Sequence, residues 1–362
     1  MRGLVFFGLM LTAGWLLPVA GLMGQAAGGF GATVHYGSIF AHSEAVQNTR
    51  GAQPLGIELQ YWRQRRDSAV YNTCRCYPRS GPLLFYTHFD SRILGSATGA
   101  GWLLEPNYRL APNLHLQMRA AAGLLVANRP YDALTNATNQ SYSTRLNAWL
   151  MYGLGVNWEL TERLTLQVSG NFQHLSNGGV RQPNKGVNWP TASVGMLVQR
   201  ESAAYFRGLR QPWQRGAQRP LTWEVGAFGV AKRVVSPSGI GTRYPVVGVW
   251  GLASRQVAHT NALAAGLELS YDASLAERLK QDSVSGHGYK LGLMAGHEFL
   301  LGRFVFSQRL GLYLHQRNPY YDGWYHRWGL QYRVGSNWWA GVGLRAHRHV
   351  ADFFDVRVVR RW

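Results

Sequence analysis

One segment of the chain decides its fold: Leu164-Thr165-Leu166-Gln167-Val168-Ser169-Gly170-Asn171-Phe172-Gln173-His174-Leu175-Ser176. Even-numbered positions up to Phe172 are apolar or Gly, whereas odd-numbered positions up to Gln173 are polar but uncharged. Successive side chains of a β-strand point to opposite faces, so this pattern predicts a strand with one apolar face and one polar face. The end of the chain alternates in the same way and places Phe354, Val356, Val358 and Trp362 opposite Asp355, Arg357 and Arg361.

Strands of this length with an apolar and a polar face are typical of outer-membrane β-barrels, in which closure satisfies every backbone group. A secreted β-sandwich also has alternating strands and is the alternative. Three features favour the barrel: the strand length, aromatic residues near strand ends, and the aromatic last residue, Trp362. After residue 26 no stretch reaches the roughly 18 consecutive apolar residues of a spanning helix. We therefore expect an all-β chain that forms an antiparallel transmembrane β-barrel.

The composition excludes other classes. The 362 residues include 43 Gly and 13% aromatic residues but only 15% charged residues, which argues against disorder and against a helical bundle. The formal net charge is +19, and only four of the 37 basic residues are lysines. Arginine matches phosphate and carboxylate oxygens, so the partner is expected to carry such groups, as nucleic acid and anionic membranes do.

The N-terminus decides between these partners. Met1 and Arg2 precede an apolar run and a small-x-small site near Ala26, which predicts a cleaved signal peptide over residues 1–26. Export makes nucleic acid an improbable target. The two cysteines, Cys74 and Cys76, then lie in an oxidising compartment, where a local loop disulfide or two plain thiols is expected and a metal role is not.

Three short matches suggest that the chain has two related halves. In order, residues 56–61 resemble 266–271, residues 119–132 resemble 309–322, and residues 155–158 resemble 335–338. A basic segment rich in Gln, Arg and Pro lies between them. We expect a barrel over 27–200, a linker over 201–220 and a second, degenerate barrel-like half over 221–362. Two tandem eight-stranded barrels are the first choice, and one barrel of 14 to 16 strands is the alternative. The first-half strands are expected near 31–41, 54–65, 82–89, 93–108, 112–127, 142–158, 162–176 and 188–200.

The chemistry lies at the end of the seventh strand. His174 and Ser176 are two residues apart and share the apolar, lipid-facing face. With the N-terminus in the periplasm, odd-numbered strands run outward, so the seventh ends beside the outer leaflet. A histidine next to a serine is the minimum for an activated nucleophile that attacks an ester, and here the ester would belong to a lipid.

The surrounding residues resemble a known family. His174-x-Ser176-Asn177-Gly178-Gly179, followed by Gln182-Pro183-Asn184-x-Gly186, is similar to the motif of the lipid A 3-O-deacylase (PagL-type, acyloxyacyl hydrolase) family of outer-membrane barrels. The resemblance covers about residues 31–200 and is supported by Tyr77-Pro78-Arg79 and Leu104-Glu105-Pro106.

The resemblance implies an outer-membrane esterase that removes an ester-linked acyl chain from the lipid A of lipopolysaccharide. Ser176 would be the nucleophile, His174 the general base, and Asn177 a contributor to the oxyanion site, with Asn184 and Gly186 as motif residues. The resemblance implies neither a metal nor a cofactor. A phospholipase acting on glycerophospholipids is a further alternative.

One position departs from the family. The acidic residue that orients the histidine is replaced here by Asn188. An amide accepts a hydrogen bond from imidazole but lacks the charge that stabilises imidazolium. Either Asn188 suffices, or another acid such as Glu159 or Glu201 serves, or the enzyme is slow or inactive. The alternative function is a non-catalytic barrel, structural or a small pore, that has lost its acid.

The second half has no His-x-Ser. Its counterpart segment, residues 341–352, contains His347 and His349, which fall opposite the apolar face and are expected to point inward. Two histidines without a further ligand make a metal site improbable. The second half is therefore expected to be catalytically silent, and to serve as a docking wall for lipid or as a partner surface.

Overall fold

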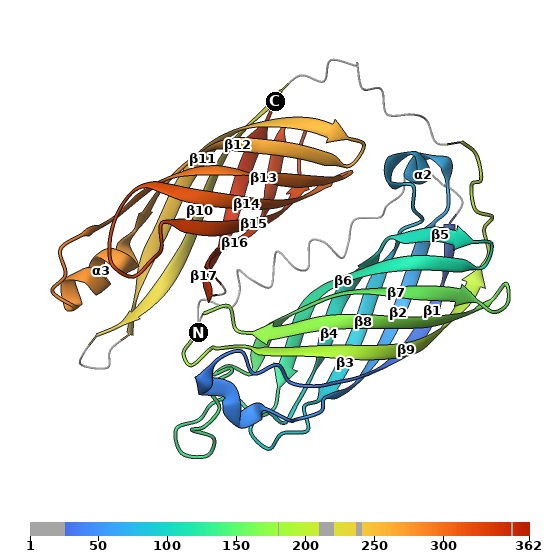
Figure 1. Cartoon of the computed structure of the whole chain (residues 1–362), viewed down its shortest axis with the longest axis horizontal. Coiled ribbons are helices and arrows are strands. Elements are labelled where there is room, and N and C mark those ends of the chain that lie inside the picture. The colour runs from blue at the N-terminus through green and yellow to red at the C-terminus, as the bar shows by residue number, and fades with distance from the viewer. Residues whose placement is uncertain (1–25, 180, 210–220, 237–240, 349) are drawn as a thin grey trace.

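The chain folds into two closed antiparallel β-barrels (Figure 1). The structure is a computed structural model and describes residues 26–179, 181–209, 221–236, 241–348 and 350–362. The expected signal peptide, apart from Ala26, and residues 210–220 of the expected linker lie outside the described residues. None of the described helices is long and apolar enough to cross a membrane.

The first barrel is a ring of eight strands. β4 and β5 are separated by one residue and both pair with β6, so they occupy one position in the ring. The ring is closed by the pairing of β4 with β6 and of β1 with β9. The strands are β1 (Ala26–Gly37), β2 (Leu55–Arg65), β3 (Arg79–His88), β4 (Ser96–Glu105), β5 (Asn107–Ala111), β6 (Leu114–Ala127), β7 (Leu146–Glu159), β8 (Leu164–Ser176) and β9 (Val187–Glu201).

The second barrel has eight strands closed between its first and last. They are β10 (Thr222–Val235), β11 (Gly241–Ala258), β12 (Asn261–Asp272), β13 (His287–Leu301), β14 (Phe304–Arg317), β15 (Trp324–Arg333), β16 (Trp338–His347) and β17 (Val350–Arg361), with helix α3 (Ala273–Gln281) after β12. The predicted antiparallel barrel is confirmed, and the alternative of a single wide barrel is wrong. Each ring closes because its first and last strands pair with one another.

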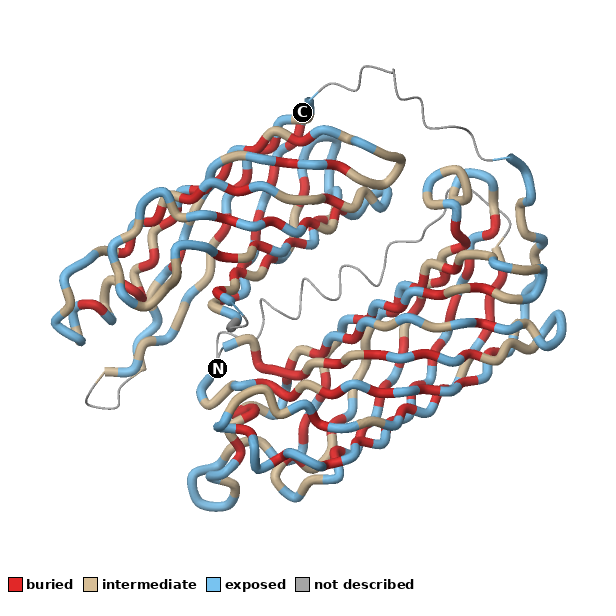
Figure 2. Tube along the Cα trace, in the orientation of Figure 1, coloured by how far each residue is buried: buried red, intermediate tan, exposed pale blue. Residues whose placement is uncertain are grey.

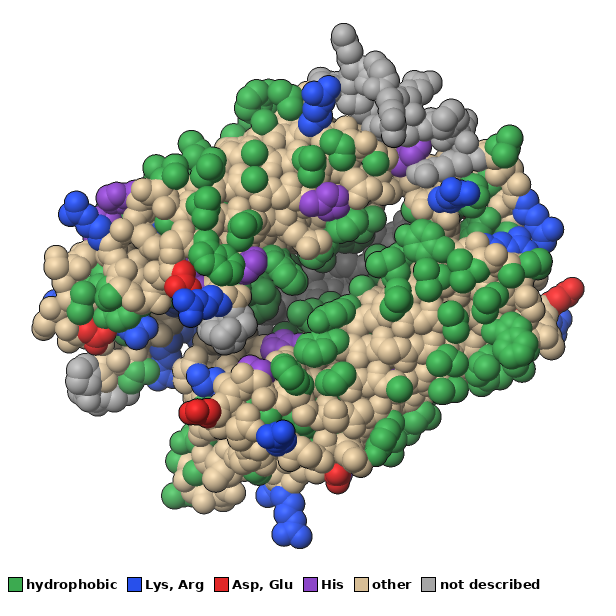
Figure 3. Space-filling view, in the orientation of Figure 1, with side chains coloured by type: hydrophobic (Ala, Val, Ile, Leu, Met, Phe, Trp, Pro, Cys, Tyr) green, Lys and Arg blue, Asp and Glu red, His purple; other side chains and the backbone are tan. Residues whose placement is uncertain are grey.

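Burial follows the predicted alternation. On β8, Gln167, Ser169 and Gln173 are buried in the lumen, whereas Val168 is 42% exposed on the outer wall. Figure 2 shows the same alternation along the strands of both barrels. Figure 3 shows hydrophobic side chains spread over the outer walls, which is the surface that an apolar membrane interior requires.

The lumen of the first barrel is filled by charges that neutralise one another. Arg119 donates to Glu58 at 2.6 Å and its Nε lies 2.7 Å from Glu105 Oε1, and Arg79 Nε lies 3.0 Å from Glu105 Oε2. All four side chains are at most 5% exposed, so each depends on its partners. The segments Tyr77–Arg79 and Leu104–Pro106, which supported the family resemblance, contact each other through the Arg79–Glu105 ion pair. A lumen filled by its own side chains is what an eight-stranded ring predicts.

The second lumen is built by the same principle. Glu268 accepts from Arg327 and from Arg345, and Arg309 donates to Glu298 at 2.5 Å.

The two ends of the first barrel differ. At the end near residue 26, the connection between β2 and β3 contains the short helix α2 (Ser68–Cys74) and a disulfide between Cys74 and Cys76. The other end has the two longest connections, residues 38–54, with the 3-10 helix η1 (Glu44–Thr49), and residues 128–145, together with residues 89–95 and 177–186. β8 ends there, so the candidate residues lie at the end with the long loops.

Two details differ from the sequence expectation. The first strand spans Ala26–Gly37 rather than 31–41, because η1 and its flanks already form the loop. The first repeat match also falls on non-equivalent strands: residues 56–61 lie on the second strand of their barrel, whereas residues 266–271 lie on the third strand of theirs. Arg119 and Arg309 do lie on the fifth strand of each ring. A Gly-x-Glu-x-x-aromatic pattern suits any strand that places its Glu in a lumen, so the first match does not identify equivalent strands.

Candidate active site

The site lies where β8 leaves the barrel wall. His174 and Ser176 are both on the outward face, as the periodicity predicts, and Gln173 and Leu175 point inward. The loops of this end cover the pair, so His174 is half-buried and Ser176 is only 7% exposed. A polar pair on a lipid-facing wall is therefore partly shielded from acyl chains.

A chain of hydrogen bonds orders the pair. His174 Nε2 lies 3.0 Å from Ser176 Oγ, and His174 Nδ1 lies 2.6 Å from Asn188 Oδ1. An amide oxygen can only accept, so the proton sits on Nδ1 and leaves Nε2 free to accept from the serine hydroxyl. This tautomer is the one that a general base needs.

A second imidazole continues the chain, and sequence reasoning missed it. The Asn188 amide nitrogen donates to His42 Nδ1 at 2.9 Å, and His42 Nε2 lies 3.0 Å from the carbonyl oxygen of Lys185. The segment after β1 continues along β9, with Phe40 N donating to Asn188 O at 2.8 Å, and this contact brings His42 to the site. The two residues are separated by 146 positions, so no local pattern could have linked them.

The Asn188 side chain bonds both imidazoles, accepting from one and donating to the other. Its oxygen accepts from His174 while its nitrogen donates to His42. A carboxylate could accept from His174 but could not donate to His42. The amide can therefore form both hydrogen bonds, whereas a carboxylate could form only the one to His174 while His42 keeps its present tautomer.

The motif residues hold the loop after β8. The Asn177 backbone N donates to Asn184 Oδ1 at 2.9 Å, and the Asn177 amide donates to Ser143 Oγ at 3.2 Å and to the carbonyl oxygen of Arg181 at 2.7 Å. These bonds attach the residue after the serine to two other parts of the loops. The expected oxyanion role of Asn177 stays a prediction, since its described donors bond within the loops.

Gly186 is a glycine for two reasons. Its φ is +77°, which L side chains rarely adopt, and a Cβ there would lie 2.7 Å from His174 Cε1. The backbone thus packs directly against the imidazole and leaves no room for a methyl group.

We expect Gly186→Ala to lower kcat of ester hydrolysis roughly 10- to 100-fold, because the methyl group displaces the imidazole from Ser176. Steady-state kinetics on the purified, folded barrel measures the change. Gly51→Ala is the matched control: Gly51 also has positive φ, at +88°, but an added Cβ meets nothing within 4 Å. Equal activities of the two variants would contradict the prediction.

Family models match both halves of the chain. The family model described as Lipid A 3-O-deacylase (PagL) matches residues 84–196, which contain His174, Ser176 and Asn188. The model described as Acyloxyacyl hydrolase, C-terminal domain, matches residues 221–362, which contain the whole second barrel. The chain belongs to the PagL-type acyloxyacyl hydrolase family.

Solved structures resemble the chain at low identity. The outer membrane enzyme PagL is 14% identical, with a TM-score of 0.35, over 46% of this chain and 97% of its own. The siderophore receptor PirA from Acinetobacter baumannii is 8% identical, with a TM-score of 0.26, over 90% of this chain and 53% of its own. A porin mutant from Rh. blastica is 10% identical, with a TM-score of 0.22, over 92% of this chain and 99% of its own. No curated protein matches the chain.

The other acids that the sequence suggested as partners of His174 lie at the wrong end of this PagL-type barrel. Glu159 ends β7 opposite the start of β8 and accepts a hydrogen bond from Tyr205 at 2.6 Å. Glu201 ends β9 next to Gly28. Each is separated from His174 by most of a strand, so neither orients the imidazole.

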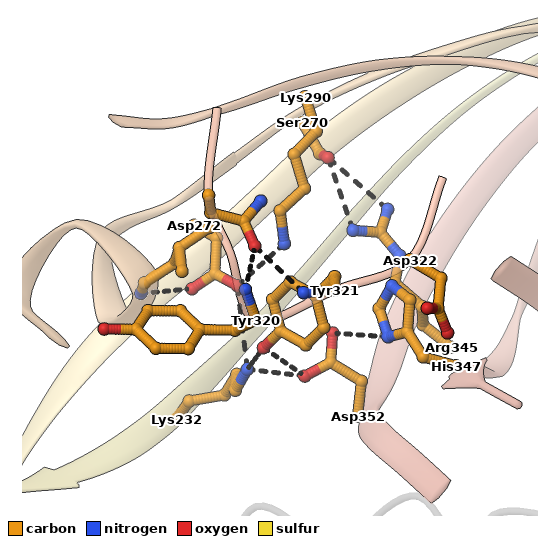
Figure 4. Close-up of polar contacts among 12 residues, drawn as sticks. Lys232, Ser270, Asp272, Lys290, Tyr320, Tyr321, Asp322, Arg345, His347 and Asp352 are labelled. Atoms are coloured by element: carbon orange, nitrogen blue, oxygen red, sulfur yellow. Dashed lines mark hydrogen bonds and ion pairs between the residues drawn. The ribbon is translucent and has the colours of Figure 1, made fainter. Parts of the chain in front are cut away.

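The C-terminal acyloxyacyl hydrolase domain carries a different polar cluster at the end that bears α3 (Figure 4). His347 points into this lumen, as expected: it stacks on Tyr321 and its Nε2 lies 2.9 Å from Tyr313 OH. Lys232 donates to Asp352 at 2.6 Å. Burial raises the pKa of Tyr321, so its phenol stays protonated and donates to Asp352 at 3.2 Å. These contacts close the lumen with side chains. His349 lies outside the described residues.

The described residues contain no group of three or more His, Cys, Asp or Glu side chains that could hold a metal ion. Cys74 and Cys76 are joined to each other, which agrees with the local disulfide that the sequence left open beside plain thiols.

Proposed function

We propose that the first barrel is an outer-membrane esterase that hydrolyses an ester-linked acyl chain of lipid A, with lipopolysaccharide of the outer leaflet as its substrate. The observation that carries the proposal is the hydrogen-bonded row Ser176–His174–Asn188, placed on the outward face at the end with the long loops. The family description supports the choice of lipid A.

Ser176 and His174 divide the chemistry. As Ser176 Oγ attacks the ester carbonyl carbon, its proton passes to His174 Nε2, and the carbonyl oxygen becomes an oxyanion. When the intermediate collapses, the bond to the sugar oxygen breaks and that oxygen takes the proton from His174. Water then attacks the acyl-enzyme, again losing its proton to His174, and the fatty acid leaves with Ser176 restored. None of these steps calls for a metal or cofactor.

Asn188 and His42 orient the base. Hydrogen bonding to Asn188 keeps the Nδ1 proton in place while Nε2 accepts, and His42 holds the amide in the orientation that presents its oxygen. The amide supplies no full charge to the imidazolium, so we propose an enzyme that turns over slowly relative to one with a carboxylate at this position.

Mass spectrometry of lipid A from outer membranes with and without the protein tests this function. Loss of one hydroxyacyl chain in the presence of the protein supports it. Unchanged spectra from a folded, heat-modifiable protein would reject it and favour the non-catalytic barrel. Loss of a chain from glycerophospholipid alone would identify a phospholipase instead.

We expect His42→Phe to lower kcat roughly tenfold with little change in KM, because Asn188 loses the partner that fixes its amide orientation. The measurement is steady-state deacylation by the purified barrel. His88→Phe is the matched control, since His88 is an exposed histidine at the same rim whose Nδ1 accepts from the nearby Asp90 N–H. If His42→Phe keeps full kcat, His42 has no positioning role.

A further inference from the structure

The two barrels approach each other beside Ser176. An added Cβ on Gly178, two residues after the serine, would lie 3.2 Å from the ring of Phe354 on β17. Phe354 is on the outward face of the second barrel and is 37% exposed. In Figure 1 the ends that carry η1 and α3 lie toward the same side, so both barrels present their long-loop ends together. The outer wall of the second barrel therefore lies next to the serine.

A basic pocket lies at the same rim and takes its lining from both barrels. It has a volume of about 390 Å³ and is lined by Thr144 and Arg181 from the first barrel and by Arg233, Gly241 and Arg243 from the second. The three arginines are exposed, and no carboxylate is among the lining residues. Guanidinium groups that converge in this way suit the oxygens of a phosphate.

Two of these arginines face each other across a strand pair. Arg233 on β10 is directly opposite Arg243 on β11. Like charges in this arrangement repel, and the repulsion is relieved when an anion lies between them. Gly241 allows the arrangement, because the Arg233 guanidinium occupies the space that a side chain at 241 would take.

The loop that follows Ser176 also positions the third arginine. The carbonyl oxygen of Arg181 accepts from Asn177 at 2.7 Å and from Ser143 at 2.9 Å. The residue adjacent to the serine thus bonds the backbone of an arginine that lines the pocket.

We propose that the groove between the barrels is the substrate site: the outer wall around Phe354 binds an acyl chain beside Ser176, and Arg181, Arg233 and Arg243 bind a phosphate of the same lipid. The second barrel, silent in catalysis, is then the docking wall that selects phosphorylated, acylated lipids. This inference rests on the proposed function for its choice of lipid.

Lipid binding by protein that lacks the nucleophile tests the groove separately from the reaction. In Ser176→Ala protein, the double variant Arg233→Ala/Arg243→Ala is expected to weaken binding of bisphosphorylated lipid A in detergent micelles roughly tenfold or more. Binding of dephosphorylated lipid A should not change between the two proteins. Phe354→Ala is expected to weaken binding of both lipids by about threefold, through lost apolar contact.

Two control variants remove the same residue types at positions away from the groove. Arg255→Ala removes an exposed arginine from β11 at the other end of the same strand, and Phe304→Ala removes an outward phenylalanine from the other end of the second barrel. Both should bind lipid A like the parent. Heat-modifiable migration shows that each variant is folded.

Two outcomes would overturn the proposal: unchanged affinity of the arginine double variant for phosphorylated lipid A, or an equal loss for the dephosphorylated form. Full displacement of the lipid by inorganic phosphate would assign the pocket to free phosphate and overturn it as a lipid site. Absence of deacylation by the wild type, with arginine-dependent binding intact, would reject the proposed function and leave the groove standing.

Discussion

Replacing Ser176 with alanine is expected to lower deacylation roughly 10⁴-fold or more, to the level of membranes without the protein. Its Oγ is 3.0 Å from His174 Nε2, and in the proposed mechanism it forms the bond to the acyl carbon. Removing a nucleophile abolishes the covalent route, whereas removing a binding contact changes KM. The readout is mass spectrometry of lipid A from matched outer membranes.

Ser176→Ala should leave the barrel folded. The side chain sits at the end of β8, and the backbone pairing of Ala148 with residue 176 does not depend on the hydroxyl. Ser202→Ala, at an exposed serine beyond the other end of the barrel, is the matched control and should retain full activity. Deacylation by Ser176→Ala protein would show that another group is the nucleophile.

Replacing Asn188 with aspartate is expected to raise kcat, by roughly 10²-fold. The carboxylate would accept from His174 Nδ1 at the same position and would add a full charge beside the imidazolium that forms in each transition state. The reverse replacement in a serine triad costs about 10⁴ in kcat, which sets the upper limit. The gain is smaller here because aspartate cannot donate to His42, which must move its proton to Nδ1 and lose the bond to Lys185 O.

Steady-state kinetics of three proteins decides this second prediction. Asn188→Asp should exceed the wild type, and Asn188→Ala should fall below it, because alanine leaves the Nδ1 proton without an acceptor. KM should change little in either variant, since Asn188 lies behind His174 and does not face the groove. An aspartate variant no faster than the wild type would show that charge at this position does not limit the reaction.

Much of the architecture could be predicted because the alternation of apolar and polar side chains is visible within the sequence of each strand. The alternation along Leu164–Ser176 determined which face of β8 is apolar, and that alone placed His174 and Ser176 on the outer wall. The motif from His174 to Gly186 brought the nucleophile, base and loop residues into one short segment. Gly186 was predicted only as a motif residue; its positive φ and its contact with the imidazole, which explain the glycine, are seen in the structure.

The same local patterns could not predict which residues far apart in the sequence contact each other in the barrel. His42 meets Asn188 only because the chain after β1 continues along β9, and Glu159 is excluded only because β7 and β8 pair in a register that places it at the far end. Each relation depends on strand pairing between distant residues, whereas a period of two leaves the pairing partner undefined.

The sequence by itself determined that the chain forms strands with an apolar outer face and that a Ser–His pair lies at one strand end on the lipid side. Tertiary structure alone decided the number of rings, the role of Asn188 as a bridge between two imidazoles, and the approach of Phe354 and the arginines to the serine. The physical reason is range: side-chain alternation is fixed by the backbone of each strand, whereas closure, buried ion pairs and contacts between barrels depend on which distant segments satisfy one another.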